Sequence, residues 1–189
     1  IPMWDGCHPY DQIAAQFSCH RVAPDGALEH HEWVADGPGD PRPEMARRVI
    51  EACEGAQTVV AYNMGFEKGC LERMAQALPA EAAALRAIIA RLADPLVVVR
   101  EHVYHPDFGG SFSLKSVLPA LVPELSYDGL AIADGEIASR VLGRLLLSSE
   151  DIPPEERMDQ REALMRYCER DTLAMVRVVE KLRELAGAS

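Results

Sequence analysis

"TVVAYNMGFEKGCLERMAQAL", residues 58–78, is the stretch of sequence that decides the fold class. Its first five residues are β-branched or apolar, which predicts a buried strand over 58–62. From there apolar residues recur at helical spacing to about Leu78, and Asn63 stands where a helix N-cap belongs. A buried strand that passes directly into a helix is typical of α/β proteins.

The segment before this stretch has the pattern of a β-hairpin. Apolar residues alternate over 12–21 with Ile13, Ala15, Phe17 and Cys19 on one side, and residues 28–34 resume an extended pattern. The turn-forming sequence APDGA separates the two runs. We therefore expect an antiparallel pair of strands, followed by a short helix that ends near Gly55.

The segment after it alternates between helical and extended patterns. Asp94-Pro95 breaks a helical pattern, and LVVVR after it is β-branched, which predicts a strand. The expected elements are helices over 81–93, 113–121, 134–147 and 155–185 and a strand over 96–100. We expect one domain over residues 1–189, an α/β fold whose mixed sheet combines the hairpin with parallel strands and is flanked by helices.

Composition and charge limit the class of protein. The chain has 189 residues, with 30 Asp and Glu against 19 Lys and Arg, and a formal net charge of -11. This charge works against loose attraction to phosphate backbones, although bound divalent cations can invert the local field. No apolar run approaches the roughly 20 residues that cross a bilayer, so we expect a cytoplasmic protein without a membrane partner.

The five cysteines predict neither a disulfide framework nor a zinc site. Their number is odd and they form no C-x-x-C pair. The repeated dipeptides Cys7-His8 and Cys19-His20 lack the spacing of zinc ligands, and Cys19 fits the buried side of a strand.

Asp171 interrupts the apolar stripe of the last helix. The stripe consists of Leu164, Cys168, Asp171, Met175, Val178, Leu182 and Leu185. A carboxylate on a core-facing stripe is costly unless it is ion-paired, hydrogen-bonded or bound to metal. A salt bridge to a buried arginine, or a place at the rim of the stripe, would also explain it. Tyr167, one turn earlier, brings a hydroxyl to the same face.

Glu67 is a second carboxylate in an unexpected place. It shares a face with Leu71, Met74 and Leu78, in the first turn of a helix that leaves the sheet's carboxyl edge. An acidic residue at a helix N-terminus is also favourable without any function. Two inward carboxylates on different helices indicate a Mg²⁺ or Mn²⁺ site that aligns a water for attack on phosphorus.

Several motifs carry a resemblance to a known superfamily. YCERD (167–171) is a Tyr-x-x-x-Asp, and YNMGFEKGCL (62–71) resembles the Asn-x-x-Phe-Asp segment of the DnaQ-like 3′-5′ exonucleases, with Glu67 in place of Asp. SFSLKSVL (111–118) and DGEIASRVL (134–142) resemble the helices between the second and third motifs of that superfamily. The whole chain resembles an uncharacterised bacterial family in which this domain often accompanies a Cas4-like nuclease domain.

The resemblance implies an RNase H-like fold and a two-metal site. Asp171 and Glu67 would be two of four acidic ligands for Mg²⁺ or Mn²⁺, and Tyr167 would position the nucleophilic water. The implied substrate is a 3′ end of single-stranded DNA or RNA, with Asn63, Phe66 and Lys115 as substrate-binding residues. Asn63 would also support the start of the helix that carries Glu67. A solvated helix surface is the other interpretation of Lys115 and of Ser113.

The chain departs from this superfamily at its first motif. An Asp-x-Glu strand should precede the hairpin, and nothing upstream of Gln12 supplies it; the triplet 134–136 has the right letters but marks a helix N-terminus. The resemblance thus implies a chain that begins after its first central strand, a gap in the sheet and an inactive fragment.

Two other function classes remain open. The first is a non-catalytic RNase H-like module that binds nucleic acid or a fused nuclease domain. The second is a small-molecule hydrolase on an unrelated α/β fold, which predicts Asp171 paired with a basic residue and no metal.

The loop at 102–112 contains residues that would contact a substrate or would hold the loop in place. His102 and His105 would gate a substrate. Phe108 and Phe112 would stack on bases or pin the loop to the body of the protein. Asp94 would face the cleft or cap a turn.

Overall fold

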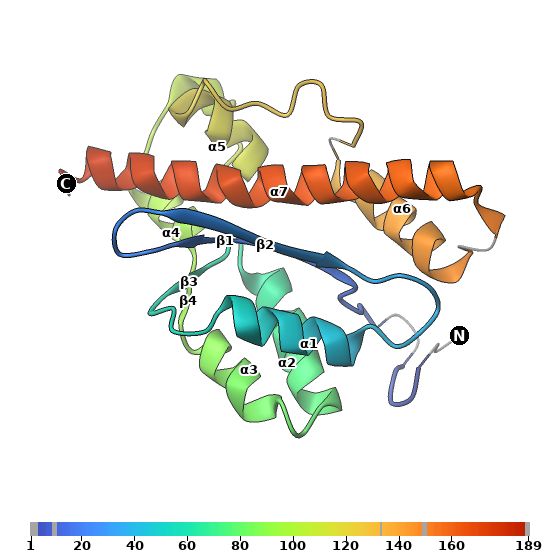
Figure 1. Cartoon of the computed structure of the whole chain (residues 1–189). Helices are drawn as coiled ribbons and strands as arrows, with labels where there is room; N and C mark the ends of the chain where they lie inside the picture. Colours follow the sequence, from blue (N-terminus) through green and yellow to red (C-terminus); the bar gives the residue numbers. More distant parts are fainter. Residues whose placement is uncertain (1–3, 9–10, 133, 149–150, 188–189) are drawn as a thin grey trace.

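The hairpin of β1 (Gln16–Val22) and β2 (Leu28–Val34) lies between two layers of helices in the computed structural model (Figure 1). The structure describes residues 4–8, 11–132, 134–148 and 151–187. One face of the hairpin contacts α7 (Pro154–Leu185), and the other contacts α1 (Arg42–Ala52). The remaining elements are α2 (Gly65–Ala77), α3 (Ala82–Ile89), α4 (Pro95–His102), the 3₁₀ helix η1 (Pro106–Phe108), α5 (Leu114–Leu121) and α6 (Gly135–Leu147).

The two faces of the hairpin follow the alternation of the sequence. Its strands are antiparallel, with Gln16 opposite Val34 and Val22 opposite Leu28. Ser18 hydrogen-bonds to Thr172 of α7, whereas Phe17 packs against the apolar cluster formed by α1, α2 and α3. The predicted hairpin is confirmed, and it is covered on both sides.

A second, very short sheet lies beside the hairpin. Here β3 (Val59–Val60) pairs in parallel with β4 (Leu92–Ala93). Within the described residues no strand is hydrogen-bonded to both sheets. The predicted mixed α/β fold is therefore confirmed as an antiparallel hairpin and a separate parallel pair flanked by helices.

Three local predictions are wrong. The strand expected at 96–100 is the helix α4, because Asp94 accepts a hydrogen bond from the Leu96 N–H (3.0 Å) and Pro95 suits a first helical turn. The helix expected to run to residue 93 ends at Ile89, and the strand follows directly. Asn63 does not cap α2: it has φ of 58°, Met64 occupies the cap position, and the strand before it is only two residues long.

The other predicted helices are confirmed. Helices α5, α6 and α7 begin and end within a few residues of the expected limits. Asp134 caps α6, accepting hydrogen bonds from the N–H groups of Glu136 (2.7 Å) and Ile137 (3.4 Å). The triplet 134–136 is thus a helix start, as expected.

The largest buried side chains form separate apolar clusters around the hairpin. One lies between α1, α2 and α3 and includes Met45 and Leu85. A second joins α6 to the first half of α7, through Leu145 and Leu164. A third joins α4 and α5 to the second half of α7, where Val178 is fully buried. Helix α7 therefore links the last two clusters.

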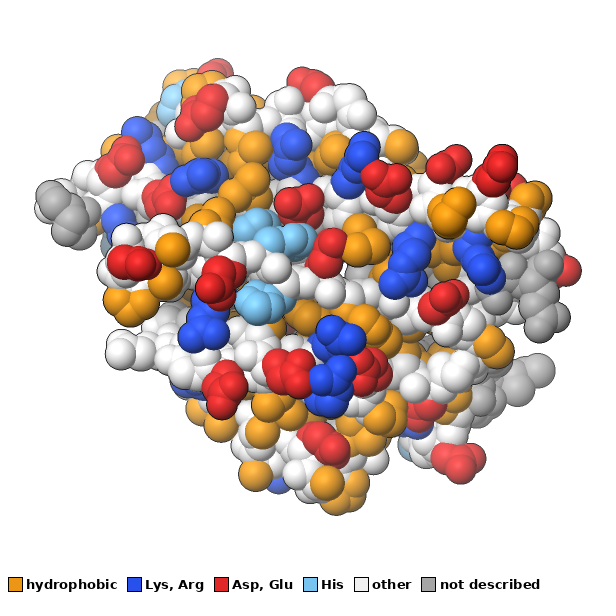
Figure 2. Space-filling view, in the orientation of Figure 1, with side chains coloured by type: hydrophobic (Ala, Val, Ile, Leu, Met, Phe, Trp, Pro, Cys, Tyr) orange, Lys and Arg blue, Asp and Glu red, His pale blue; other side chains and the backbone are white. Residues whose placement is uncertain are grey.

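The surface mixes charges of both signs. On the face drawn in Figure 2, acidic and basic side chains are interspersed, and histidine side chains gather near its centre. Among the described helices, none combines the length and apolar character needed to cross a bilayer.

Candidate functional site

Five of the six residues predicted for the site line one open cavity of about 690 Å³. Helix α7 supplies Tyr167 and Asp171, α2 supplies Glu67, and α5 supplies Lys115, while Asn63 lies in the turn before α2. We call this the Glu67–Asp171 cavity. The sixth residue, Phe66, is 58% exposed and lies outside the lining.

Asp171 is held by phenol groups. The Tyr127 hydroxyl donates a hydrogen bond of 2.6 Å to Asp171 Oδ1, and the Tyr167 hydroxyl also hydrogen-bonds to this carboxylate. The adjacent Arg170 instead donates to the backbone oxygen of Ser126 (2.6 Å). Asp171 itself is half-buried, between the fully buried Leu164 and Val178 on the same stripe.

Burial has the largest effect on the pKa of Asp171. It raises the pKa of Asp171, against the opposing effects of the two phenol hydrogen bonds and the charge of Lys115. Burial first, and the charge of Asp171 second, raise the pKa values of Tyr127 and Tyr167. Both phenols therefore stay protonated at neutral pH and act as hydrogen-bond donors to Asp171.

Tyr127 was not predicted from the sequence. It lies in the segment between α5 and α6, and 44 residues separate it from Asp171. Lys115 links it to the cavity, because its Nζ lies 5.5 Å from the ring centre of Tyr127 and 5.3 Å from that of Tyr167. The only sequence signal was an aromatic residue with a hydroxyl in an otherwise polar turn.

Glu67 lies at the cavity from the first turn of α2. The surrounding protein raises its pKa, mainly by desolvation and further through the charge of Asp94. Because the residue is exposed, solvent screens this effect. Its position satisfies both interpretations from the sequence, a favourable N-terminal acid and a cavity-lining carboxylate.

The Asp94 carboxylate hydrogen-bonds to the start of α4 and to the turn that precedes α2. Besides capping α4, its carboxylate accepts hydrogen bonds from the N–H groups of Asn63 (2.8 Å) and Met64 (3.0 Å), which lead into α2. The prediction that Asp94 acts as a cap is confirmed. It also fixes the turn from which Asn63 reaches the cavity, so Asp94 positions the carboxylate of Glu67 indirectly.

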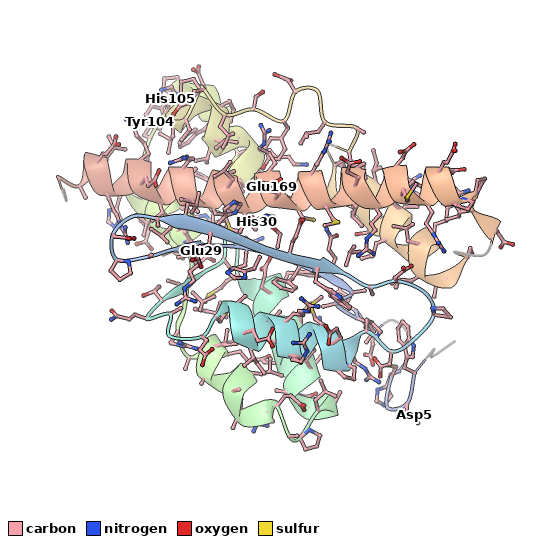
Figure 3. The ribbon with its side chains drawn as sticks, in the orientation of Figure 1. Asp5, Glu29, His30, Tyr104, His105 and Glu169 are labelled. Atoms are coloured by element: carbon pink, nitrogen blue, oxygen red, sulfur yellow. The ribbon has the colours of Figure 1, made fainter. Side chains whose placement is uncertain are left out.

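The aromatic loop is pinned to the protein body. Phe108 is only 4% exposed and meets Phe112 edge-on, with 6.1 Å between ring centres. The Tyr62 hydroxyl donates to the backbone oxygen of Phe112 (2.7 Å). His105 caps η1 through Nδ1, and it lies beside the exposed Tyr104 (Figure 3). The pinning interpretation of Phe108 is therefore confirmed.

Basic side chains also line the Glu67–Asp171 cavity. Arg100 of α4 lines it, as does Ser113, whose hydroxyl caps α5 by accepting from the Ser116 N–H (3.3 Å). Arg100 was missed because its segment was expected to be a strand. The cavity thus combines two carboxylates, two tyrosines, Lys115 and Arg100, a set that can bind a cation together with a phosphate group.

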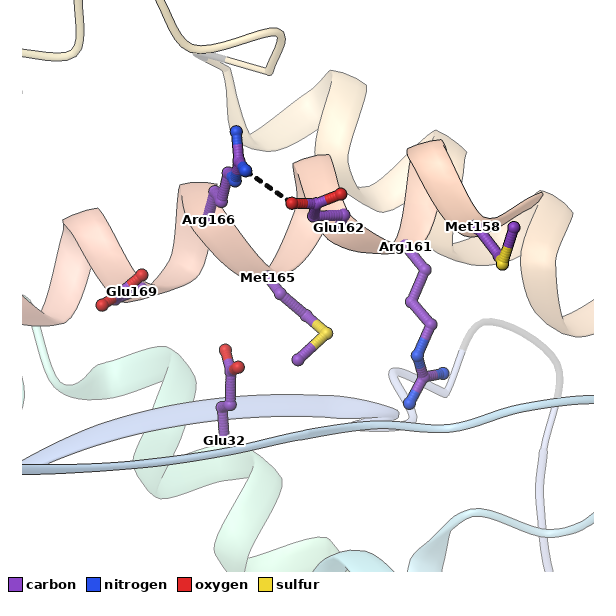
Figure 4. A pocket seen from close by; sticks show the side chains of 7 residues that line it. All are labelled: Glu32, Met158, Arg161, Glu162, Met165, Arg166 and Glu169. Atoms are coloured by element: carbon purple, nitrogen blue, oxygen red, sulfur yellow. Dashed lines mark hydrogen bonds and ion pairs between the residues drawn. The ribbon is translucent and has the colours of Figure 1, made fainter. Parts of the chain in front are cut away.

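A second, smaller cavity contains none of the predicted residues. It has a volume of about 310 Å³ and lies between β2 and α7 (Figure 4). Part of its charge is already neutralised within α7, where Arg166 donates to Glu162 at 2.5 Å. Its lining consists of Glu32, Met158, Arg161, Glu162, Met165, Arg166 and Glu169.

Comparison with known families gives one match. A family described as "Domain of unknown function (DUF2779)" matches residues 1–113. The chain belongs to this family. The matched part of the DUF2779 domain includes Asn63, Glu67 and Asp94, whereas Tyr167 and Asp171 lie beyond it. Neither the curated proteins nor the solved structures contain a match to the chain.

Proposed function

We propose that this DUF2779 domain belongs to a metal-dependent nuclease that hydrolyses phosphodiester bonds at the 3′ end of single-stranded nucleic acid. The observation that carries the proposal is that Glu67 and Asp171 line the same cavity. The two carboxylates come from different helices, more than a hundred residues apart in sequence. Tyr167 and Lys115 lie in the same cavity, as the resemblance to DnaQ-like exonucleases implies.

The donor atoms of the cavity fit Mg²⁺ or Mn²⁺. Both ions prefer oxygen ligands, and Mg²⁺ is commonly held by one or two carboxylates together with water and substrate phosphates. Glu67 and Asp171 would hold the ions, with water and substrate phosphate oxygens as the further ligands. Two bound metal ions would activate water and neutralise the charge on the leaving oxygen.

The protein's own side chains would orient the reactants. The protonated Tyr167 hydroxyl, already hydrogen-bonded to Asp171, would orient a water beside that carboxylate. Lys115 and Arg100 would face the phosphate and stabilise its charge. The exposed ring of Phe66, next to Glu67, would stack on a base, and Asn63 would contact the substrate from the cavity wall.

The test is nuclease activity on end-labelled single-stranded DNA and RNA with Mn²⁺, using the full-length natural protein. We expect Asp171→Asn to lower the rate about 100-fold or more, as loss of a group that acts directly in catalysis does. The control is Glu180→Gln on the same helix, whose carboxylate only pairs with Arg177 (2.8 Å). Equal rates in both variants would overturn the proposal.

A non-catalytic module is the second candidate. It is favoured by the glutamate at position 67, where the superfamily has aspartate. This alternative predicts binding of single strands without cleavage at any Mn²⁺ concentration, and binding that Asp171→Asn leaves unchanged.

A further inference from the structure

Two histidines form a cross-strand pair on the face of the hairpin that contacts α7. His20 of β1 lies opposite His30 of β2, and their rings stack with 4.5 Å between centres and 23° between planes. Figure 3 shows His30 below Glu169 of α7. One ligand atom from each of His20, His30 and Glu169 can be chosen so that all three lie within 4.8 Å of one another.

Two hydroxyls hold the rings in place. Ser18 Oγ lies 2.8 Å from His30 Nε2 and 2.9 Å from Thr172 Oγ1. Thr172 Oγ1 in turn lies 2.8 Å from His20 Nδ1. Each ring therefore has one nitrogen engaged by a hydroxyl, which leaves His20 Nε2 and His30 Nδ1 as the nitrogens for another ligand. Metal-binding histidines are typically oriented by such a hydrogen bond on the other ring nitrogen.

We propose that His20, His30 and Glu169 form a binding site for a divalent transition-metal ion, with Zn²⁺ as the best-fitting ion. Two imidazoles and one carboxylate are a ligand set that Zn²⁺ accepts, and three protein ligands leave a fourth position for water or another ligand. The site uses none of the residues of the Glu67–Asp171 cavity, so it is independent of the proposed nuclease function.

Binding requires the two rings to turn as well as the ligand atoms to approach, because a bound ion lies in the plane of each imidazole and the two planes are only 23° apart. Zinc–ligand distances of about 2.0–2.2 Å place tetrahedral ligand atoms roughly 3.3 Å apart. His30 Nδ1 already lies 3.9 Å from Glu169 Oε1. The side chain of Glu169 is 49% exposed, so it can rotate toward the rings without disturbing the core.

The surroundings give the ion access to solvent. Glu169 also lines the smaller cavity, together with Glu32 and Met165 (Figure 4). The fourth position of the ion would therefore open toward this cavity. A small anion would suit that position, since the cavity also carries Arg161.

The experiment is metal titration of the metal-free protein under reducing conditions. Zn²⁺ binding is measured by calorimetry, and Co²⁺ binding by visible absorption, which reports ligand type and coordination number. We expect one high-affinity ion per chain with a nitrogen–oxygen spectrum. Glu169→Gln and His30→Ala should each weaken binding about tenfold or more, whereas Glu180→Gln on the same helix and the exposed His102→Asn should not.

Thr172→Val separates a metal site from a simple polar network. Thr172 would not touch the ion, but its loss releases the His20 ring, and a loss of this kind weakens metal binding about 10- to 100-fold. The proposal is overturned by a thiolate charge-transfer band with Co²⁺, by binding that survives Glu169→Gln and His30→Ala, or by no binding to the folded protein.

Discussion

Tyr127 and Asp171 are joined by a hydrogen bond of 2.6 Å between the phenol and the carboxylate, although 44 residues separate them in the chain. This bond ties the segment between α5 and α6 to the middle of α7. It also explains how a carboxylate is tolerated within an apolar stripe without an arginine beside it, because two phenols supply the donors.

Tyr127→Phe should destabilise the protein. The substitution removes one donor and leaves a half-buried carboxylate with fewer partners, which costs about 1–3 kcal/mol in free energy of unfolding. Urea unfolding at pH 7 measures the loss. Tyr104→Phe is the matched control, since Tyr104 is 87% exposed and its change should stay within about 0.5 kcal/mol. Equal effects of the two substitutions would show that the hydrogen bond does not stabilise the fold.

Asp171→Asn should stabilise the metal-free protein at pH 7, by about 0.5–2 kcal/mol, the usual range for stabilising substitutions. Burial raises the pKa of Asp171 above its unfolded value, so the folded state binds the proton more tightly. The contribution of Asp171 to stability is therefore present at low pH and is lost as the pH rises through the folded pKa.

The pH series supplies the check on this sign. Thermal unfolding of Asp171→Asn and the wild type should differ most at pH 7 and converge as the pH falls toward the pKa of Asp171. A difference that instead grows on acidification would contradict the assigned direction of the pKa shift. Asp171→Asn should therefore lower the rate of hydrolysis and raise the stability of the fold, a combination that is common for functional residues.

Asp94→Ala should be among the most destabilising changes of an exposed or half-buried polar residue. It removes the cap of α4 and two further hydrogen bonds to the turn before α2, for about 2–4 kcal/mol in all. Asp25→Ala is the control, because Asp25 accepts only one bond, from the Ala27 N–H (3.0 Å) in an exposed turn. Chemical denaturation compares them, and similar losses would contradict the linking role of Asp94.

Lys115→Gln should weaken binding of single-stranded nucleic acid if the Glu67–Asp171 cavity is the substrate site. Loss of one phosphate contact should lower the slope of log affinity against log salt by about 0.7 for a single strand. Fluorescence anisotropy with a labelled oligonucleotide at several salt concentrations measures this slope. Lys181→Gln is the control, since Lys181 pairs with Glu184 on α7 (2.9 Å). An unchanged slope would place the substrate elsewhere.

Much of the fold was predictable because the hydrophobic period is strong in the long elements. The alternation around Phe17 predicted the face of the hairpin that packs against α1, α2 and α3, and the spacing around Val178 predicted α7. The helix after Asp94 was not predicted correctly, because three consecutive valines favour a strand locally. Its cap, together with the burial of Val99 against α5 and α7, makes it a helix.

The site was predictable where a single residue conflicts with its own pattern. Asp171 on an apolar stripe is such a conflict, and it identified the cavity. Tyr127 and Arg100 lacked any conflict of this kind, because a tyrosine in a turn and an arginine at a helix end are ordinary residues. The pairing of His20 with His30 depends on strand register, which the sequence alone did not fix.

The 32 residues of α7 bear on how the protein opens as well as on where its side chains point. Because this helix buries Leu164 in one apolar cluster and Val178 in another, those two clusters should lose amide protection together in hydrogen exchange. The apolar cluster between α1, α2 and α3 contains no buried residue of α7. It should therefore exchange as a separate cooperative unit. Glu67 and Asp171 would then belong to different units, so the two halves of the cavity could separate without global unfolding.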